Sequence, residues 1–139
     1  MVAEKLIGNF ATHAHAVAAG KYKFVYGPIK KLADITVPLR EVDQLVGLSH
    51  PNEELTVAEV YNRFGGLMLD LPAHEAYGAV HADDPADFPV VVIWSEGGKF
   101  WVAIRAAGLE QRYLFVSTRD ADEVLPPCCR YLLRVPTAE

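Results

Sequence analysis

The spacing of apolar residues predicts a helix at the start of the chain. Apolar side chains recur every three or four positions from residue 6 to residue 17, as expected for one face of a helix. Gly20 then provides a natural C-terminal stop. The residues that form this stripe are Leu6, Phe10, Ala14 and Val17. On such a helix His13 would lie beside the stripe, whereas His15 would face water.

After Gly20 the apolar period changes from helical spacing to two. Aromatic residues at 22, 24 and 26 alternate with other residues before Gly27-Pro28, a pattern typical of a strand. The stretch 28–55 is ambiguous. Residues 33–37 could form a short strand, and the apolar positions after Pro38 suggest a short helix over about 39–46.

A capping box marks the next helix. Thr56 is followed three positions later by Glu59, so that each side chain can bond the backbone of the other residue. The motif predicts a helix over about 57–64 that Gly65-Gly66 ends. Residues 67–71 form a candidate strand, and the loop-type residues over 72–89 predict an irregular connection.

The second half of the chain is predicted to be mostly β-structure. The unbroken apolar run 90–94 is typical of a strand buried on both faces. Glycines at 97 and 98 suggest a hairpin, after which strands are expected over 100–105, 112–117 and 130–135. Consecutive strands with short connections usually pair antiparallel. The predicted fold class is therefore α+β, with an antiparallel sheet of about 4–6 strands, two or three helices, and the N-terminal helix first.

Length and composition favour one globular domain over residues 1–139. The chain has 139 residues and is 51% hydrophobic, which is enough for a core and argues against disorder. Apolar runs are too short for a membrane-spanning helix, and the first residues lack the pattern of a secretory signal. The only two cysteines, Cys128 and Cys129, are adjacent, so a disulfide framework is excluded. These features indicate a cytoplasmic protein with no membrane partner.

Charged residues are segregated along the sequence. Four lysines fall within residues 21–31, whereas the interval between Arg63 and Lys99 contains six acidic residues and no basic one. The chain could therefore carry a basic and an acidic patch that suit a charged partner or a second copy, unless the fold brings them together. Acidic loops that only maintain solubility are the alternative.

One face of the predicted sheet is the leading candidate for partner binding. If the strand register permits, this face collects large aromatic residues and arginines, which are the types that anchor protein interfaces. The alternative is that helices cover the face and the arginines only line its rim. The predicted partner-binding residues are Trp101, Arg105, Tyr113, Phe115, Arg130 and Arg134.

A polar site is the competing hypothesis. Asp70 lies between leucines, where a carboxylate needs a partner or a function. His74 and Glu75 follow closely, and His50 or Tyr61 could join them. The histidines and carboxylates of 74–84 have metal-ligand chemistry but match no metal-binding spacing, so no metal or other cofactor is predicted.

Nucleic-acid binding is the third hypothesis and rests on residues 21–31 alone. Lysines there alternate with aromatic residues, but on a strand the two kinds point to opposite faces, and the net charge of −5 argues against it. No nucleophile elbow or phosphate loop is present. The sequence therefore favours a non-catalytic protein, such as an inhibitor or an accessory subunit, that binds another protein or itself. A small enzyme or ligand-binding protein is the alternative.

Overall fold

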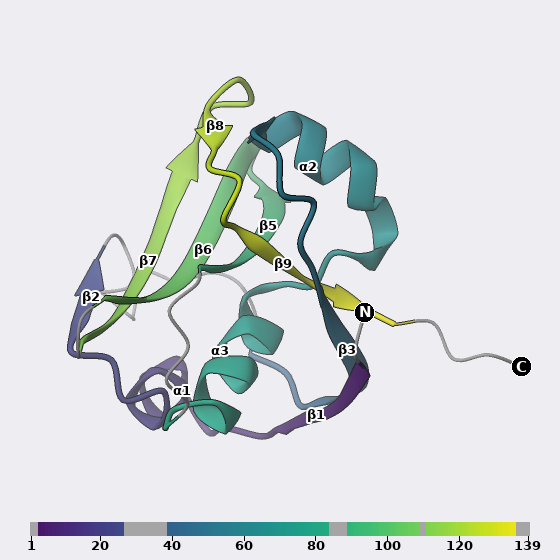
Figure 1. The fold of residues 1–139 in the computed structure, drawn as a ribbon. Helices are drawn as coiled ribbons and strands as arrows, with labels where there is room; N and C mark the ends of the chain where they lie inside the picture. The colour runs from purple at the N-terminus through teal and green to yellow at the C-terminus, as the bar shows by residue number, and fades with distance from the viewer. Residues whose placement is uncertain (1–2, 27–38, 84–88, 109–110, 136–139) are drawn as a thin grey trace, which may run out of the picture.

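The computed structural model describes residues 3–26, 39–83, 89–108 and 111–135, and shows an α+β fold with a mixed sheet (Figure 1). Its helices are α1 (His13–Ala19), α2 (Val57–Phe64), the short 3-10 helix η3 (Gly65–Leu67) and α3 (Leu71–Val80). Its strands are β1 (Ala3–Gly8), β2 (Phe24–Tyr26), β3 (Val42–Ser49), β4 (Leu55–Thr56), β5 (Val90–Glu96), β6 (Lys99–Gly108), β7 (Gln111–Arg119), β8 (Val124–Leu125) and β9 (Arg130–Arg134).

Seven strands form the main sheet, in the order β1-β3-β9-β5-β6-β7-β2, and β4 pairs with β8 in a separate ribbon. Most neighbours are antiparallel, but β2 is parallel to β7 and β5 is parallel to β9. The wholly antiparallel sheet was therefore wrong. Short hairpins join β5 to β6 and β6 to β7, whereas the strands of each parallel pair are far apart in the sequence. Strands β6, β7 and β8 lie between β5 and β9, and a longer segment that includes α2 and α3 lies between β2 and β7.

The first element is a strand, which corrects the predicted N-terminal helix. β1 buries Leu6 and Gly8 and exposes Lys5 and Ile7, so its true period is two. It pairs antiparallel with β3 at one edge of the sheet. The helix begins later, at His13, where the Thr12 side chain accepts a hydrogen bond from the His15 amide. The helical spacing at residues 6 and 10 was thus fortuitous.

Local signals located several elements correctly. The capping box of Thr56 and Glu59 is present, and α2 covers the expected residues. The predicted strands 90–94, 100–105, 112–117 and 130–135 correspond to β5, β6, β7 and β9. The predicted strand of residues 22–26 is shorter, because β2 begins at Phe24. The candidate strand at 33–37 lies outside the described residues.

Two segments have the wrong predicted structure. The helix expected over 39–46 is strand β3, which is placed between β1 and β9. Residues 67–71, predicted as a strand, contain the end of η3 and one isolated bridge from Met68 to Leu133. The predicted loop 72–89 contains α3. Its N-cap is Asp70, and Pro72 lies in its first turn.

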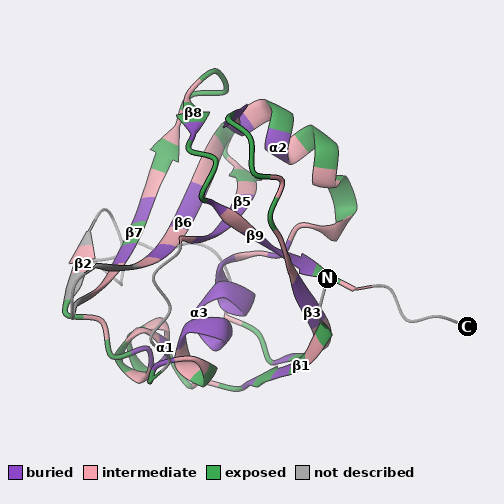
Figure 2. Cartoon of the chain, viewed as in Figure 1, coloured by how far each residue is buried: buried purple, intermediate pink, exposed green. Residues whose placement is uncertain are grey.

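Helices cover both faces of the sheet. α1 packs on α3, and α3 packs on β1, β3, β5 and β6, whereas α2 packs on β5 from the other side. Figure 2 shows α3 buried over most of its length, whereas α2 exposes one side. Because α3 is enclosed all round, its sequence lacks the polar stripe of a surface helix. Among the described helices, none is long and apolar enough to cross a membrane.

Candidate functional site

The sheet register divides the six predicted partner-binding residues between two faces. Trp101 and Arg105 lie on one face of β6 because they are four positions apart. Phe115 pairs with Ile104, and Tyr113 with Ala106, so these two aromatic residues lie on the opposite face. One continuous aromatic and arginine face is therefore not formed.

Arg105 is an internal residue. It is only 2% exposed, and its Nη2 donates a hydrogen bond to the carbonyl oxygen of His81 at 2.8 Å. Its guanidinium carbon lies 5.9 Å from the centre of the Tyr77 ring. α3 thus covers the end of β6 that the sequence hypothesis had placed on the surface.

The remaining predicted arginines lie on β9, which β5 and β6 separate from β7. Arg134 is exposed and donates a hydrogen bond to the carbonyl oxygen of Gly66 at 3.2 Å. Arg130 is partly buried and pairs with Val90 across the parallel β5–β9 ladder. These arginines therefore do not adjoin Tyr113 and Phe115.

The predicted aromatic residues remain partly accessible in two places. Trp101 stacks on Trp94, with ring centroids 6.2 Å apart and planes inclined by 12°. On the other face Phe115 is 37% exposed, and its ring centroid lies 6.4 Å from that of Tyr113. The two aromatic pairs lie on opposite faces of the sheet, so these predicted residues do not form one aromatic interface.

A buried polar cluster lies between α1, α3 and β6. It consists of His13, Tyr22, His74, Glu75 and Arg105. The His13 Nδ1 and the Glu75 Oε1 are 2.8 Å apart and join α1 to α3. His74 donates through Nε2 to the carbonyl oxygen of Val90, 2.9 Å away on β5. The sequence had grouped two of these residues with Asp70, and the fold adds His13, Tyr22 and Arg105.

Burial shifts the pKa values of three groups in this cluster. It raises the pKa of Glu75 to about 7, although the adjacent His13 opposes the shift. It lowers the pKa of His74 to about 4, and the positive charge of Arg105 acts in the same direction. It raises the pKa of Tyr22 to about 12, against the opposing effect of Arg105 and Arg112. All three shifts favour the neutral form, as expected away from water.

Asp70 has a structural role at the end of α3. Its carboxylate caps the helix at the Ala73 amide and forms two hydrogen bonds with the guanidinium of Arg40, at 2.9 and 3.2 Å. Its side chain is partly exposed and lies at the edge of the buried polar cluster, where its negative charge helps to raise the pKa of Glu75. The other two candidates also have structural contacts: His50 bonds the carbonyl oxygen of Pro127, and Tyr61 packs edge-on against Phe100.

Gly78 provides the space for the Tyr22 hydroxyl, because a Cβ at residue 78 would overlap with that oxygen. We expect Gly78→Ala to lower the free energy of unfolding by about 1–3 kcal/mol through overpacking. In a Tyr22→Phe background the oxygen is gone and the nearest ring carbon lies 3.2 Å from the added Cβ, so the same change should cost clearly less. Urea unfolding of the four proteins checks this. Equal costs in both backgrounds would show that the hydroxyl is not the obstacle.

The fold brings the predicted basic and acidic segments together. Lys21 forms an ion pair with Asp83 at 2.7 Å, across 62 positions of sequence. Glu75 is buried and Asp70 pairs with Arg40, so neither adds to an acidic surface. Residues 30, 31, 84 and 87 lie outside the described residues. The two predicted patches therefore neutralise each other in part.

A different acidic surface forms where β4, β8 and the N-terminus of α2 meet. The Val57 amide donates to the Glu123 carbonyl, and the Ala58 amide to the Ala121 carbonyl, so the β7–β8 loop lies against α2 (Figure 1). Val124 is 56% exposed, follows Glu123 in the sequence and pairs with Thr56 across the β4–β8 ribbon. We call this surface the acidic end; its carboxylates belong to Glu53, Glu54, Glu59, Asp120, Asp122 and Glu123.

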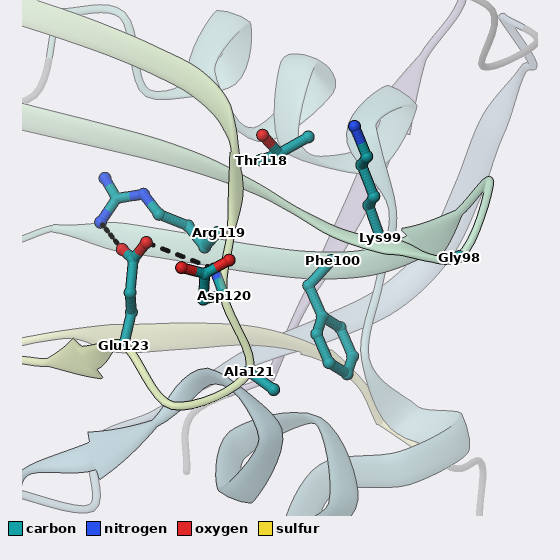
Figure 3. Close-up of a pocket in the computed structure, with 8 residues that line it drawn as sticks. All are labelled: Gly98, Lys99, Phe100, Thr118, Arg119, Asp120, Ala121 and Glu123. Atoms are coloured by element: carbon teal, nitrogen blue, oxygen red, sulfur yellow. Dashed lines mark hydrogen bonds and ion pairs between the residues drawn. The ribbon is translucent and has the colours of Figure 1, made fainter.

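A pocket of about 510 Å³ opens beside the acidic end, where β6 begins and β7 ends (Figure 3). Phe100 and Ala121 point the same way in this view, whereas Lys99 points away from Phe100. An ion pair of 3.3 Å joins Arg119 to Glu123. The lining residues are Gly98, Lys99, Phe100, Thr118, Arg119, Asp120, Ala121 and Glu123.

The side chains that could bind a metal ion are spread apart in the described part of the chain. Within residues 3–26, 39–83, 89–108 and 111–135, no three His, Cys, Asp or Glu side chains form a group that could hold a metal ion. His81 instead bonds Glu4 at 2.9 Å, and α3 carries His74 into the core. Cys129 is buried and Cys128 exposed, and both are free thiols.

Sequence reasoning missed the acidic end and the pocket. Two short acidic runs, 53–54 and 120–123, were visible, but only the β4–β8 pairing shows that they are neighbours. Comparison of the chain with models of protein families, with curated proteins and with solved structures finds no match. The functional argument therefore depends on the chain's own surface and core.

Proposed function

We propose that this protein acts without catalysis, by binding another protein of basic character through its acidic end. The observation that supports this proposal is that two separate chain segments, residues 53–59 and 120–123, contribute carboxylates to the end of the molecule where β4 pairs with β8 and Val124 is exposed. Among described residues, Arg63 pairs with Glu53 and Arg119 pairs with Glu123, which leaves the surface with excess negative charge. Such a surface steers a basic partner and can pack an apolar contact at its centre.

This surface replaces the aromatic and arginine face as the proposed contact. Arg105 is buried, and the other five residues are spread over both faces and over distant strands. Trp101 and Phe115 stay candidates for additional contacts because each is partly accessible.

Charge reversal tests the proposal. We expect Glu54→Lys combined with Asp122→Lys to slow association with a basic partner by about tenfold at low salt, because these charges act mainly on the association rate. The partner is captured from host extract by wild-type protein and purified, and its association rates are then measured. The difference should shrink as salt is added.

A matched control uses carboxylates elsewhere. Glu41→Lys combined with Asp43→Lys makes the same change in net charge beside β1, at two exposed positions, and also removes the exposed ion pair of Asp43 with Lys5. This control should retain most of the wild-type rate. Equal slowing by both variants would show that only net charge matters, and unchanged rates in the first variant would refute the acidic end as the contact.

A ligand-binding or catalytic function is the second candidate, and the buried polar cluster favours it. Glu75 is 2% exposed yet ionisable near neutral pH, beside His13 and close to Tyr22. Perturbed acids beside polar partners are common at functional sites. A small molecule that remains bound to wild-type protein in native mass spectrometry, but not to Glu75→Gln, would establish this candidate.

A further inference from the structure

The pocket beside the acidic end combines an aromatic ring with a carboxylate that has no described ion-pair partner. Phe100 contributes the ring, which also packs against the core on this face of the sheet and edge-on against Tyr61, 5.2 Å away between ring centroids. Asp120 donates its backbone amide to Glu123, but no described residue forms an ion pair with its side chain. A ring face and an ionised carboxylate together are the usual surroundings of a bound cation.

The basic residues that line the pocket do not cancel its preference for a cation. The guanidinium of Arg119 is paired with Glu123 in the same wall. Lys99 precedes Phe100 on β6, so strand alternation sends the two side chains to opposite faces, and Figure 3 shows them pointing apart. Asp120 and Glu123 line the pocket and also belong to the acidic end, so the pocket lies within a region of negative charge.

We propose that this pocket binds an arginine side chain of the partner protein. Arginine fits better than lysine because its planar guanidinium can stack on Phe100 and donate paired hydrogen bonds to Asp120. A pocket of about 510 Å³ is large enough for this side chain and its flanking peptide. The inference rests on the proposed function, since it names the group by which the basic partner is held.

A titration with a small probe tests the pocket directly. Nα-acetyl-arginine methylamide is added to ¹⁵N-labelled protein at low salt, and its neutral isostere Nα-acetyl-citrulline methylamide serves as the reference probe. We expect the arginine probe to shift the amide signals of Gly98, Phe100, Asp120 and Ala121 in a saturable way. Citrulline should produce no such shifts. Equal shifts with both probes, or shifts confined to other residues, would overturn the proposal.

Two adjacent carboxylates supply a matched pair of variants. Asp120→Asn should weaken the arginine probe by about tenfold, because a hydrogen bond to an ionised carboxylate is roughly twice as strong as a neutral one. Asp122 is exposed but does not line the pocket, so Asp122→Asn should change the affinity by less than about twofold. Equal weakening would indicate general attraction to the acidic end and would refute a specific pocket.

The same variants separate this inference from the proposed function. If the captured partner loses affinity on charge reversal of the acidic end but not on Asp120→Asn, the pocket proposal fails and the proposed function stands. If the arginine probe binds as expected but the charge-reversed protein binds partners normally, the proposed function fails. A loss of partner affinity in Asp120→Asn that clearly exceeds the loss in Asp122→Asn supports both.

Discussion

We expect Glu75→Gln to stabilise the protein at pH 8. The difference in the free energy of unfolding between variant and wild type should be up to about 3 kcal/mol more favourable at pH 8 than at pH 4. Burial raises the pKa of this carboxyl from 4.5 to about 7 in the folded protein. Below pH 4.5 the group is protonated in both the folded and unfolded states, so it costs nothing. Between pH 4.5 and 7 the unfolded state ionises first, and stability is lost as the pH rises.

Gln is a suitable replacement because it preserves the size of the side chain and an oxygen that can accept a hydrogen bond from His13. Urea unfolding at pH 4, 6 and 8 measures the free energy of unfolding of both proteins. The stabilisation should appear as the pH rises through this range. A difference between variant and wild type that does not change with pH would show that Glu75 has an ordinary pKa in the folded state.

His74→Gln is expected to have the opposite pH dependence. Burial lowers the pKa of His74 from 6.5 to about 4, so the folded protein strongly prefers the neutral ring. Above pH 6.5 both states hold the neutral ring, and its contribution is fully present. As the pH falls from 6.5 to 4 the unfolded state binds the proton first, and wild-type protein loses up to about 3 kcal/mol from this group.

The variant removes that loss but weakens packing at every pH. His74 is fully buried and bonds Val90, so Gln should lower the free energy of unfolding at pH 7 by about 1–3 kcal/mol. The test is the slope: between pH 6.5 and 4 the variant should lose less stability than wild type. An identical acid slope in the two proteins would contradict the prediction.

In wild-type protein, His74 and Glu75 have opposite effects on the pH dependence of the free energy of unfolding. Between about pH 4.5 and 6.5 the gain from His74 and the loss from Glu75 nearly cancel as the pH rises. Each single variant should therefore show the pH dependence of the residue that remains. Stability should rise with pH in Glu75→Gln and fall with pH in His74→Gln. The double variant is the control, and it should have little pH dependence from this helix. Similar slopes in both single variants would mean that the two groups titrate as one coupled unit.

Local chemistry made parts of the fold predictable. Thr56 and Glu59 form their reciprocal cap within four residues, so no distant contact is needed to begin α2. The run 90–94 has a sequence that fits a strand buried on two faces, and β5 is such a strand. Strands 100–105 and 112–117 followed from alternation and turns, which are also local properties.

α3 could not be predicted in the same way. Its residues from Leu71 to Gly78 are all buried, including His74 and Glu75, so neither an apolar stripe nor a polar stripe marks it as a helix. Gly78 and Pro72 added the appearance of a loop. Asp70 as N-cap and Pro72 in the first turn are local signals of a helix start, but the packing of α1, β1 and the sheet around the segment is what stabilises a fully buried helix.

For the candidate surfaces, too, the sequence predicted the residue types but not their arrangement in space. The sequence identified Trp101, Tyr113 and Arg105 as unusual residues, but it could not decide which side of the sheet each would face or what would cover it. Register and helix placement bury Arg105 and separate the aromatic residues. Similarly, the pairing of β4 with β8 brings residues 53–59 next to residues 120–124 at the acidic end. No local sequence pattern predicts this pairing.

The sequence by itself determined the fold class, the capped helix at 57–64, the β-rich second half and the excess of acidic groups. These features depend on interactions between residues close in the chain, or on composition alone. Tertiary structure alone decided that the first element is a strand, that His74 and Glu75 enter the core, and that Lys21 meets Asp83. It also decided which carboxylates gather at one end. Such outcomes depend on contacts between distant segments, because burial and electrostatic neighbours exist only after the chain has packed.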